Sequence, residues 1–154
     1  MNAAAHPIAF NPQWFLPALV VGMVAIAALL AYLSGWRRLA KRFPPVAQID
    51  GERFYFASAK MGMVPWFQIN YGVCLIITVG RTGIYVSIFM PFRLLCPDFF
   101  LPWSAVAGVE EQSSALSRRM VVRINGSPVS LALRGSLGHC VAATYAGAMA
   151  AAKP

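Results

Sequence analysis

The chain has 154 residues, of which 58% are hydrophobic and 12% are charged, and its mean hydropathy is +0.61. An average soluble domain carries roughly a quarter charged residues, so this composition excludes intrinsic disorder and disfavours a protein fully solvated by water. The length allows one domain, or one small domain with a membrane segment. The net charge is +8, and half of that excess comes from Arg37, Arg38, Lys41 and Arg42. Such a local cluster favours a membrane boundary over a nucleic-acid surface.

The first 36 residues contain no Lys, Arg, Asp or Glu. Residues 14–36 predict one transmembrane helix, because these 23 residues at about 1.5 Å each can cross a hydrocarbon core of about 30 Å. Trp14 and Trp36 are expected at the two membrane interfaces, where aromatic side chains gather. Residues 1–13 are expected to form a short extracytoplasmic tail. The alternative is a cleavable signal peptide, but the start has no cation and the apolar run is long for one.

Residues 37–45 are expected to form a basic amphipathic neck at the lipid headgroups. Trp36, Leu39 and Phe43 lie on one helical face, and Pro44-Pro45 ends the helix. The expected membrane-interface residues are Trp14, Trp36, Arg37, Arg38, Lys41 and Arg42. Their cations have two interpretations: a topology signal with side chains reaching the headgroups, or recognition of an anionic lipid headgroup.

The cations follow the apolar segment, so the N-terminus is expected outside and the rest of the chain in the cytoplasm. Three cysteines, Cys74, Cys96 and Cys140, stand far apart without any C-x-x-C spacing. Buried thiols in a reducing compartment agree with that placement.

Residues 46–154 predict a cytoplasmic β-rich domain, because short apolar runs alternate with Gly, Pro and Asn turns. The clearest runs are 51–59, 71–79, 84–90, 103–112, 119–125 and 129–134. Gly80–Gly83 and Asn125-Gly126 mark tight hairpins between antiparallel strands. The sequence therefore indicates about six or seven antiparallel strands.

Residues 136–152 predict an alanine-rich C-terminal helix, with Ser136 as its N-cap. A second membrane span is the alternative, but the stretch has only about 16 residues and contains His139. The expected fold is a single transmembrane helix plus an α+β or mainly-β domain. In that domain, an antiparallel sheet or split barrel is closed by the C-terminal helix.

Three short segments follow one another in the middle of this domain: Gly83-Ile-Tyr-Val-Ser, Phe92-Arg93 and Leu101-Pro-Trp-Ser-Ala-Val106. Together with the order of elements over roughly residues 46–152, they resemble the pleckstrin-homology-like (PH-like) and GRAM-like superfold. Bacterial single-pass membrane proteins of that kind carry a similar "GLYL" strand before an "IPW" segment. The resemblance implies a bacterial inner-membrane location and a non-catalytic adaptor.

PH domains that hold phosphoinositides use several Lys and Arg side chains in their first hairpin. The corresponding region here has only Arg53, Lys60 and Arg81. This departure from the family pattern counts against headgroup recognition in the family's manner.

Aromatic residues and prolines alternate between residues 89 and 103, and three prolines there disfavour a helix or a central strand. The expected docking residues, with a second cluster near residue 66, are Trp66, Phe67, Phe92, Arg93, Phe99, Phe100 and Trp103. Three interpretations stay open: these rings fill the core, face the bilayer, or contact a membrane-protein partner. Arg93 and Asp98 flank the stretch and can pair to fix its ends.

No nucleotide-binding, zinc-protease or other catalytic motif occurs, and His139-Cys140 are helix neighbours that do not face each other. No enzyme, cofactor, metal site or nucleic-acid partner is therefore expected. The sequence favours a membrane-anchored, non-catalytic adaptor or accessory subunit of a membrane protein complex. It would contact the lipid bilayer and another integral membrane protein. The alternative is an anionic-lipid-binding membrane sensor.

Overall fold

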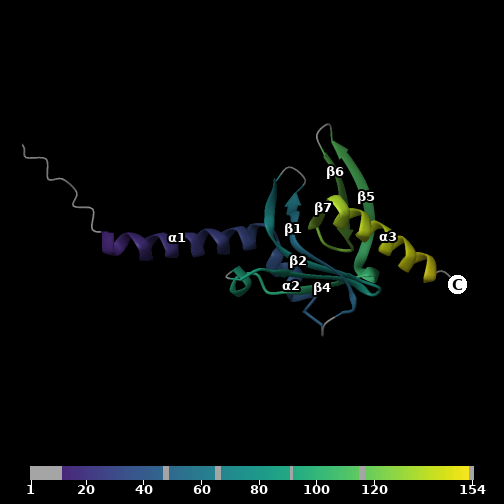
Figure 1. The fold of residues 1–154 in the computed structure, drawn as a ribbon, viewed down its shortest axis with the longest axis horizontal. Helices are drawn as coiled ribbons and strands as arrows, with labels where there is room; N and C mark the ends of the chain where they lie inside the picture. Colours follow the sequence, from purple (N-terminus) through teal and green to yellow (C-terminus); the bar gives the residue numbers. More distant parts are fainter. Residues whose placement is uncertain (1–11, 47–48, 65–66, 91, 115–116, 153–154) are drawn as a thin grey trace, which may run out of the picture.

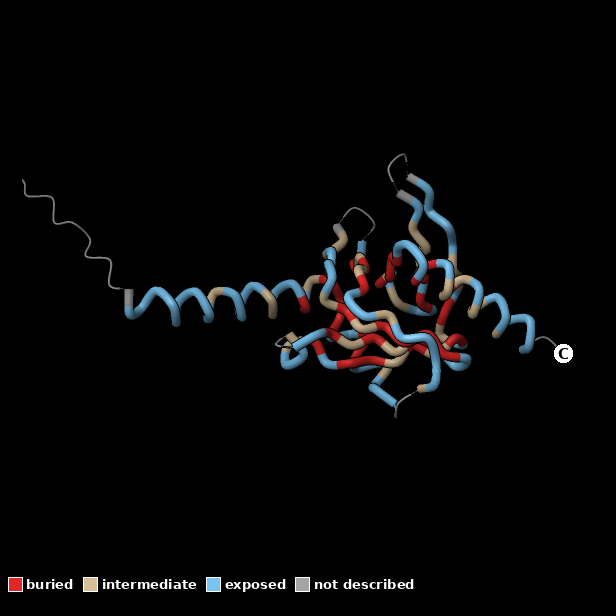
Figure 2. Tube along the Cα trace, in the orientation of Figure 1, coloured by how far each residue is buried: buried red, intermediate tan, exposed pale blue. Residues whose placement is uncertain are grey.

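A long apolar helix extends from a β-rich domain in the computed structural model, which describes residues 12–46, 49–64, 67–90, 92–114 and 117–152 (Figure 1). Helix α1, Pro12–Leu33, is exposed along almost its whole length (Figure 2). Its segment Gln13–Leu33 has a mean hydropathy of 2.4 and is 6% buried, and within the described residues it is the one helix long and apolar enough to cross a membrane.

Helix α1 ends three residues before the predicted boundary at residue 36. Gly35 adopts φ 79°, a left-handed conformation that glycine tolerates and that stops the helix. A second, short helix α2, Trp36–Arg42, then begins in a new direction. The predicted neck is therefore a helix separated from α1 by a tight turn.

Seven antiparallel strands form one sheet in the order β4-β3-β2-β1-β7-β6-β5. The strands are β1 Gly51–Val64, β2 Phe67–Gly80, β3 Gly83–Ile88, β4 Phe99–Pro102, β5 Val106–Ser114, β6 Ser117–Ile124 and β7 Ser130–Arg134. Short 3₁₀ turns η1, Phe92–Leu94, and η2, Trp103–Ala105, flank β4. Strand β1 pairs with β2 on one side and β7 on the other, so it joins the two arms of a half-barrel.

Helix α3, Gly135–Ala151, closes the chain and lies against β6, β7 and β2. Leu137 and Val141 are its buried apolar contacts with the core. Arg134 precedes the helix without a side-chain cap, so the prediction of Ser136 as N-cap is wrong; the left-handed Gly135 makes the turn instead. The largest fully buried side chains include Trp36, Phe99, Met61, Leu75, Ile77 and Leu131.

The predicted fold class is confirmed: an antiparallel half-barrel with a C-terminal helix, preceded by one apolar helix that can span a membrane. Strand β4 was not expected, because the prolines around it favour a loop. It forms because it occupies an edge of the sheet, where Pro102 at its end interrupts no ladder.

Candidate functional site

The junction between α1 and the domain is packed and hydrogen-bonded. The Ser34 hydroxyl lies 2.7 Å from the Tyr71 hydroxyl on β2. The Trp36 indole nitrogen donates to the Pro97 carbonyl at 2.8 Å, and its ring lies 5.2 Å from those of Tyr71 and Phe99. Trp36 therefore differs from the prediction: its side chain is fully buried in the domain, because these contacts satisfy both its polar and its apolar parts. Trp14, at the other end of α1, is 73% exposed.

An apolar cavity of about 300 Å³ lies beside this junction. Its lining residues come from α1, β2, β3 and the β3–β4 connection: Ala27, Leu30, Ile69, Asn70, Tyr71, Gly72, Cys74, Ile88, Phe92, Leu95 and Cys96. Burial raises the pKa of Tyr71 to about 12 and that of Cys96 to about 11. Both groups are neutral at physiological pH, so the described lining of this cavity carries no charge.

The four cations of the neck are all exposed, as a membrane-facing cluster requires. Arg42 donates to the Gly126 carbonyl at 2.8 Å and stacks over the Phe43 ring. The amphipathic face was predicted at the right spacing, but it packs on the domain instead of on lipid, because Leu39 is buried and Phe43 is half-buried there.

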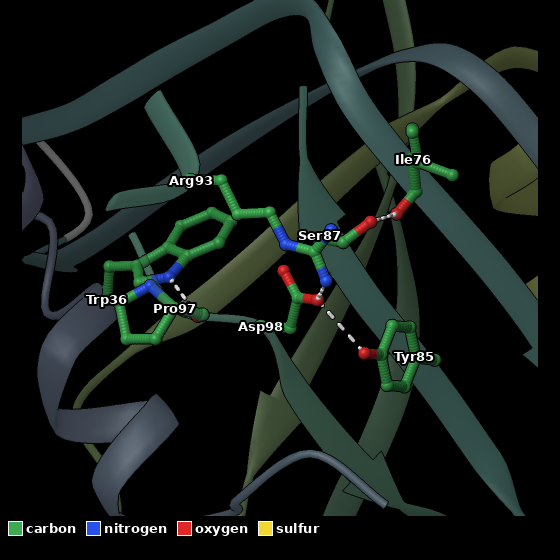
Figure 3. A network of polar contacts seen from close by, with 7 residues as sticks. All are labelled: Trp36, Ile76, Tyr85, Ser87, Arg93, Pro97 and Asp98. Atoms are coloured by element: carbon green, nitrogen blue, oxygen red, sulfur yellow. Dashed lines mark hydrogen bonds and ion pairs between the residues drawn. The ribbon is translucent and has the colours of Figure 1, made fainter. Parts of the chain in front are cut away.

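An ion pair between an exposed arginine and a buried aspartate fixes the segment between η1 and β4 (Figure 3). Arg93 Nη2 lies 2.6 Å from Asp98 Oδ2, and the Tyr85 hydroxyl donates to the same oxygen at 3.0 Å. Asp98 is only 6% exposed, and the expected Arg93–Asp98 pairing is confirmed. Burial and the hydrogen bond to Asp98 raise the pKa of Tyr85. A pocket of about 290 Å³ on this face is lined by these groups together with Arg53 and Ser87.

The predicted docking residues do not gather on one surface. Phe99 and Trp103 are buried core residues, and the Trp103 indole donates to the Gly80 carbonyl at 3.0 Å. Phe92 and Phe100 are half-buried, while Arg93 is exposed and paired. Trp66 lies outside the described residues, and Phe67 opens β2. For Phe99 and Trp103 the core interpretation is the correct one, because both are buried and their rings pack against Trp36 and Tyr145 respectively.

A different set of apolar side chains is exposed, and the sequence interpretation missed it. These are Phe56, Val73, Phe89, Met90 and Leu94, which are between 53% and 87% exposed. The signal was available in part, since Phe89 and Met90 precede the proline that interrupts the third strand. Phe56 and Val73 gave no signal, because their outward direction depends on irregularities in the β1–β2 pairing.

A cleft of about 490 Å³ opens between the β1–β2 hairpin and the β5–β6–β7 arm. Polar and apolar residues from both arms line it, among them Met63, Gln68, Gln112, Arg123 and Val129. Strand β5 is the free edge of the sheet at this arm.

The acidic residues are spread over the molecule. On the β5–β6 hairpin, Glu110 pairs with Arg123 at 2.9 Å and Glu111 pairs with Arg118 at 3.9 Å. The Cys140 thiol donates to Glu52 at 3.3 Å, which together with burial raises the pKa of the cysteine. Among the described residues, no group of His, Cys, Asp or Glu is placed to hold a metal ion.

No protein-family model and no curated protein matches this sequence. Among solved structures, the chain is similar to one described as "Vps36 N-terminal PH domain", with 14% identity and a TM-score of 0.46. The match covers 64% of this chain and 80% of that one. The fold class of this chain rests on its own strand order and C-terminal helix.

Proposed function

We propose that this protein is a membrane-tethered, non-catalytic adaptor that serves as an accessory subunit of a membrane protein complex. Helix α1 spans the bilayer with its N-terminus outside, and the β-rich domain faces the cytoplasm. The observation that carries the proposal is α1 itself: its segment Gln13–Leu33 is 6% buried and contains no charge. Exposing so much apolar surface to water is unfavourable by about 25 cal/mol per Å², and a bilayer removes that penalty.

The orientation follows from the distribution of charge. Four exposed cations lie directly after α1, and none precedes it. Lys and Arg close to a transmembrane segment favour the cytoplasmic side. The unpaired Cys74, Cys96 and Cys140 agree with that side.

The cleft between the two arms is the surface that we assign to the partner. Gln68 and Gln112 lie on opposite arms and both line the cleft. A photo-crosslinking amino acid at either position in native membranes should capture the same integral membrane protein repeatedly. The matched control is the exposed His139 on α3, which does not line this cleft. Equal capture at all three positions, or none at any, contradicts the adaptor role.

The second candidate is an anionic-lipid sensor, and the neck is the observation that favours it. Arg37, Arg38 and Lys41 are exposed on α2, directly after the turn that ends α1. Each such cation near an anionic leaflet contributes about 1 kcal/mol of attraction. Enrichment of acidic lipid around the purified chain, abolished by salt, favours the sensor over the adaptor.

A further inference from the structure

We propose that the β3–β4 connection, through residues 89–90 and 92–95, is a second membrane-embedded element that enters the acyl-chain boundary beside α1. This inference rests on the proposed function in one respect, namely that α1 spans the bilayer. It adds that the domain itself is partly immersed in lipid, through a surface formed by Phe89, Met90 and Leu94 with the neighbouring Phe56 and Val73.

The position of the connection follows from the cavity at the junction. Ala27 and Leu30 of α1 line that cavity together with Phe92 and Leu95 of the connection. Ala27 precedes the end of α1 at Leu33 by six residues, or roughly 9 Å at about 1.5 Å per residue. The connection therefore reaches back alongside the last two turns of the apolar helix (Figure 1). A bilayer that covers Gln13–Leu33 covers these turns, and the connection lies at the same depth.

The connection presents apolar side chains outward at this depth. Leu94 is 87% exposed, Met90 is 63% and Phe89 is 53%. Its one charged side chain, Arg93, is 58% exposed and forms an ion pair with the buried Asp98 (Figure 3). Transfer of each of these exposed apolar groups from water to hydrocarbon is favourable.

Two β-bulges extend this apolar surface. Phe56 and Val73 have φ of 53° and 54°, a left-handed conformation that a bulky or β-branched residue rarely adopts. Such strained backbone persists where the surroundings enforce it. Here Ser58 Oγ accepts from the Val73 backbone N–H at 3.0 Å, and the Phe56 ring lies 6.3 Å from that of Phe89. The bulges therefore hold two exposed apolar side chains next to the connection.

Lipid is the occupant that this surface fits. The connection shares a cavity with Ala27 and Leu30 of α1, and the exposed face of α1 is itself apolar. None of the described residues that line the shared cavity is ionised, and the raised pKa values of Tyr71 and Cys96 keep those groups neutral. If this surface faced water, a large apolar patch would remain exposed without a partner.

The test uses the full chain reconstituted in phospholipid vesicles, with an environment-sensitive fluorescent amino acid at one position at a time. Residue 94 reports on the β3–β4 connection, residue 19 on the membrane-spanning helix α1, and residue 118 on the β5–β6 hairpin. All three side chains are exposed, so the substitutions leave the core unchanged. Each variant is exposed to a nitroxide lipid quencher at shallow depth and, separately, to aqueous iodide.

The expected result is that residue 94 shows blue-shifted emission and loses intensity to the lipid quencher but not to iodide. Residue 19 should behave in the same way, and residue 118 in the opposite way. Quenching of residue 94 by iodide alone, with residue 19 still protected, overturns the inference while the span stands. Quenching of residue 19 by iodide overturns the span, and the inference with it.

Discussion

At the residue scale, Trp36 connects the apolar helix to the sheet. Its indole N–H is bonded to Pro97, and its ring packs edge-on against Phe99. Ser34 and Tyr71 add a hydrogen bond on the other side of the turn. Because the side chains of Ser34, Trp36, Tyr71 and Phe99 are buried, helix and domain meet through a packed contact and not through a flexible linker. The direction of α1 relative to the sheet is therefore a property of the fold.

Replacing Trp36 should destabilise the domain strongly, because the site is fully buried. We expect Trp36→Phe to cost about 1–2 kcal/mol through the lost hydrogen bond and volume, and Trp36→Ala about 3–5 kcal/mol. Chemical unfolding of the chain in detergent micelles, followed by near-ultraviolet circular dichroism, measures both. Trp14→Phe is the matched control, since Trp14 is 73% exposed and its replacement should be neutral. Equal effects at the two tryptophans would contradict the packed junction.

Tyr71 makes the same junction sensitive to alkaline pH. Burial raises its pKa from 10.0 to about 12 in the folded chain. The stability that the neutral Tyr71 hydroxyl contributes is therefore fully present below pH 10. It is lost as the pH rises from 10 to 12, because Tyr71 ionises first in the unfolded chain. At about pH 11 this loss amounts to about 1 kcal/mol for the single group. Tyr71→Phe should unfold with a smaller decrease in stability between pH 9 and 11 than the unaltered chain. Parallel decreases in the two chains would disprove it.

At the element scale, the neck helix α2 has a buried face and an exposed face with different roles. The buried face of α2, Trp36, Leu39 and Ala40, fastens the helix to the domain. The exposed face carries the cations, and Arg42 alone among them is bonded to the Gly126 carbonyl. Folding and lipid contact can therefore be altered separately by substitution on this short helix.

Neutralising the exposed face should weaken contact with anionic lipid without unfolding the domain. We expect the triple variant Arg37→Gln, Arg38→Gln, Lys41→Gln to bind acidic lipid about a hundredfold more weakly, at about 1 kcal/mol per cation. Native mass spectrometry of the chain released from mixed-lipid nanodiscs measures the retained lipid. The matched control is the substitution to Gln of three exposed arginines elsewhere: Arg53, Arg81 and Arg134. A loss of equal size in the control would show that total charge matters and the neck does not.

The elements also show what the sequence could reveal. Alternation and turn residues located six strands and α3, because period-two patterns and hairpin glycines are local signals. Strand β4 was missed because its edge position is a property of the whole sheet. The helical spacing of Trp36, Leu39 and Phe43 predicted an apolar face correctly, but spacing cannot distinguish a protein core from lipid. The exposed apolar set around Leu94 was missed because the exposure of a side chain depends on tertiary packing, which local spacing does not report.

At the scale of the whole molecule, the packed junction relates α1 to three features of the domain. The apolar helix leads into a turn with left-handed Gly35, where an added Cβ would lie 2.6 Å from Val129 Cγ2. The β3–β4 connection lies beside the end of the helix, and the cleft between the arms opens in the domain beyond. If α1 spans a membrane as proposed, its fixed direction gives the cleft a fixed height and orientation above that membrane. That would lower the entropy lost on binding the proposed partner.

Inserting Gly-Ser-Gly-Ser between Leu33 and Ser34 tests this coupling. The insertion leaves the Ser34–Tyr71 and Trp36–Pro97 hydrogen bonds in place, so the domain should fold and the chain should stay in the membrane. The cleft would then sample many orientations, because such a linker behaves as a flexible coil. We expect crosslinking from Gln68 and Gln112 to the shared partner to fall severalfold. The same insertion between Arg81 and Thr82, in the exposed β2–β3 turn, should leave crosslinking intact. Undiminished capture after insertion at residue 33 would mean that proximity alone suffices, and that the packed junction serves the stability of the domain and not its orientation.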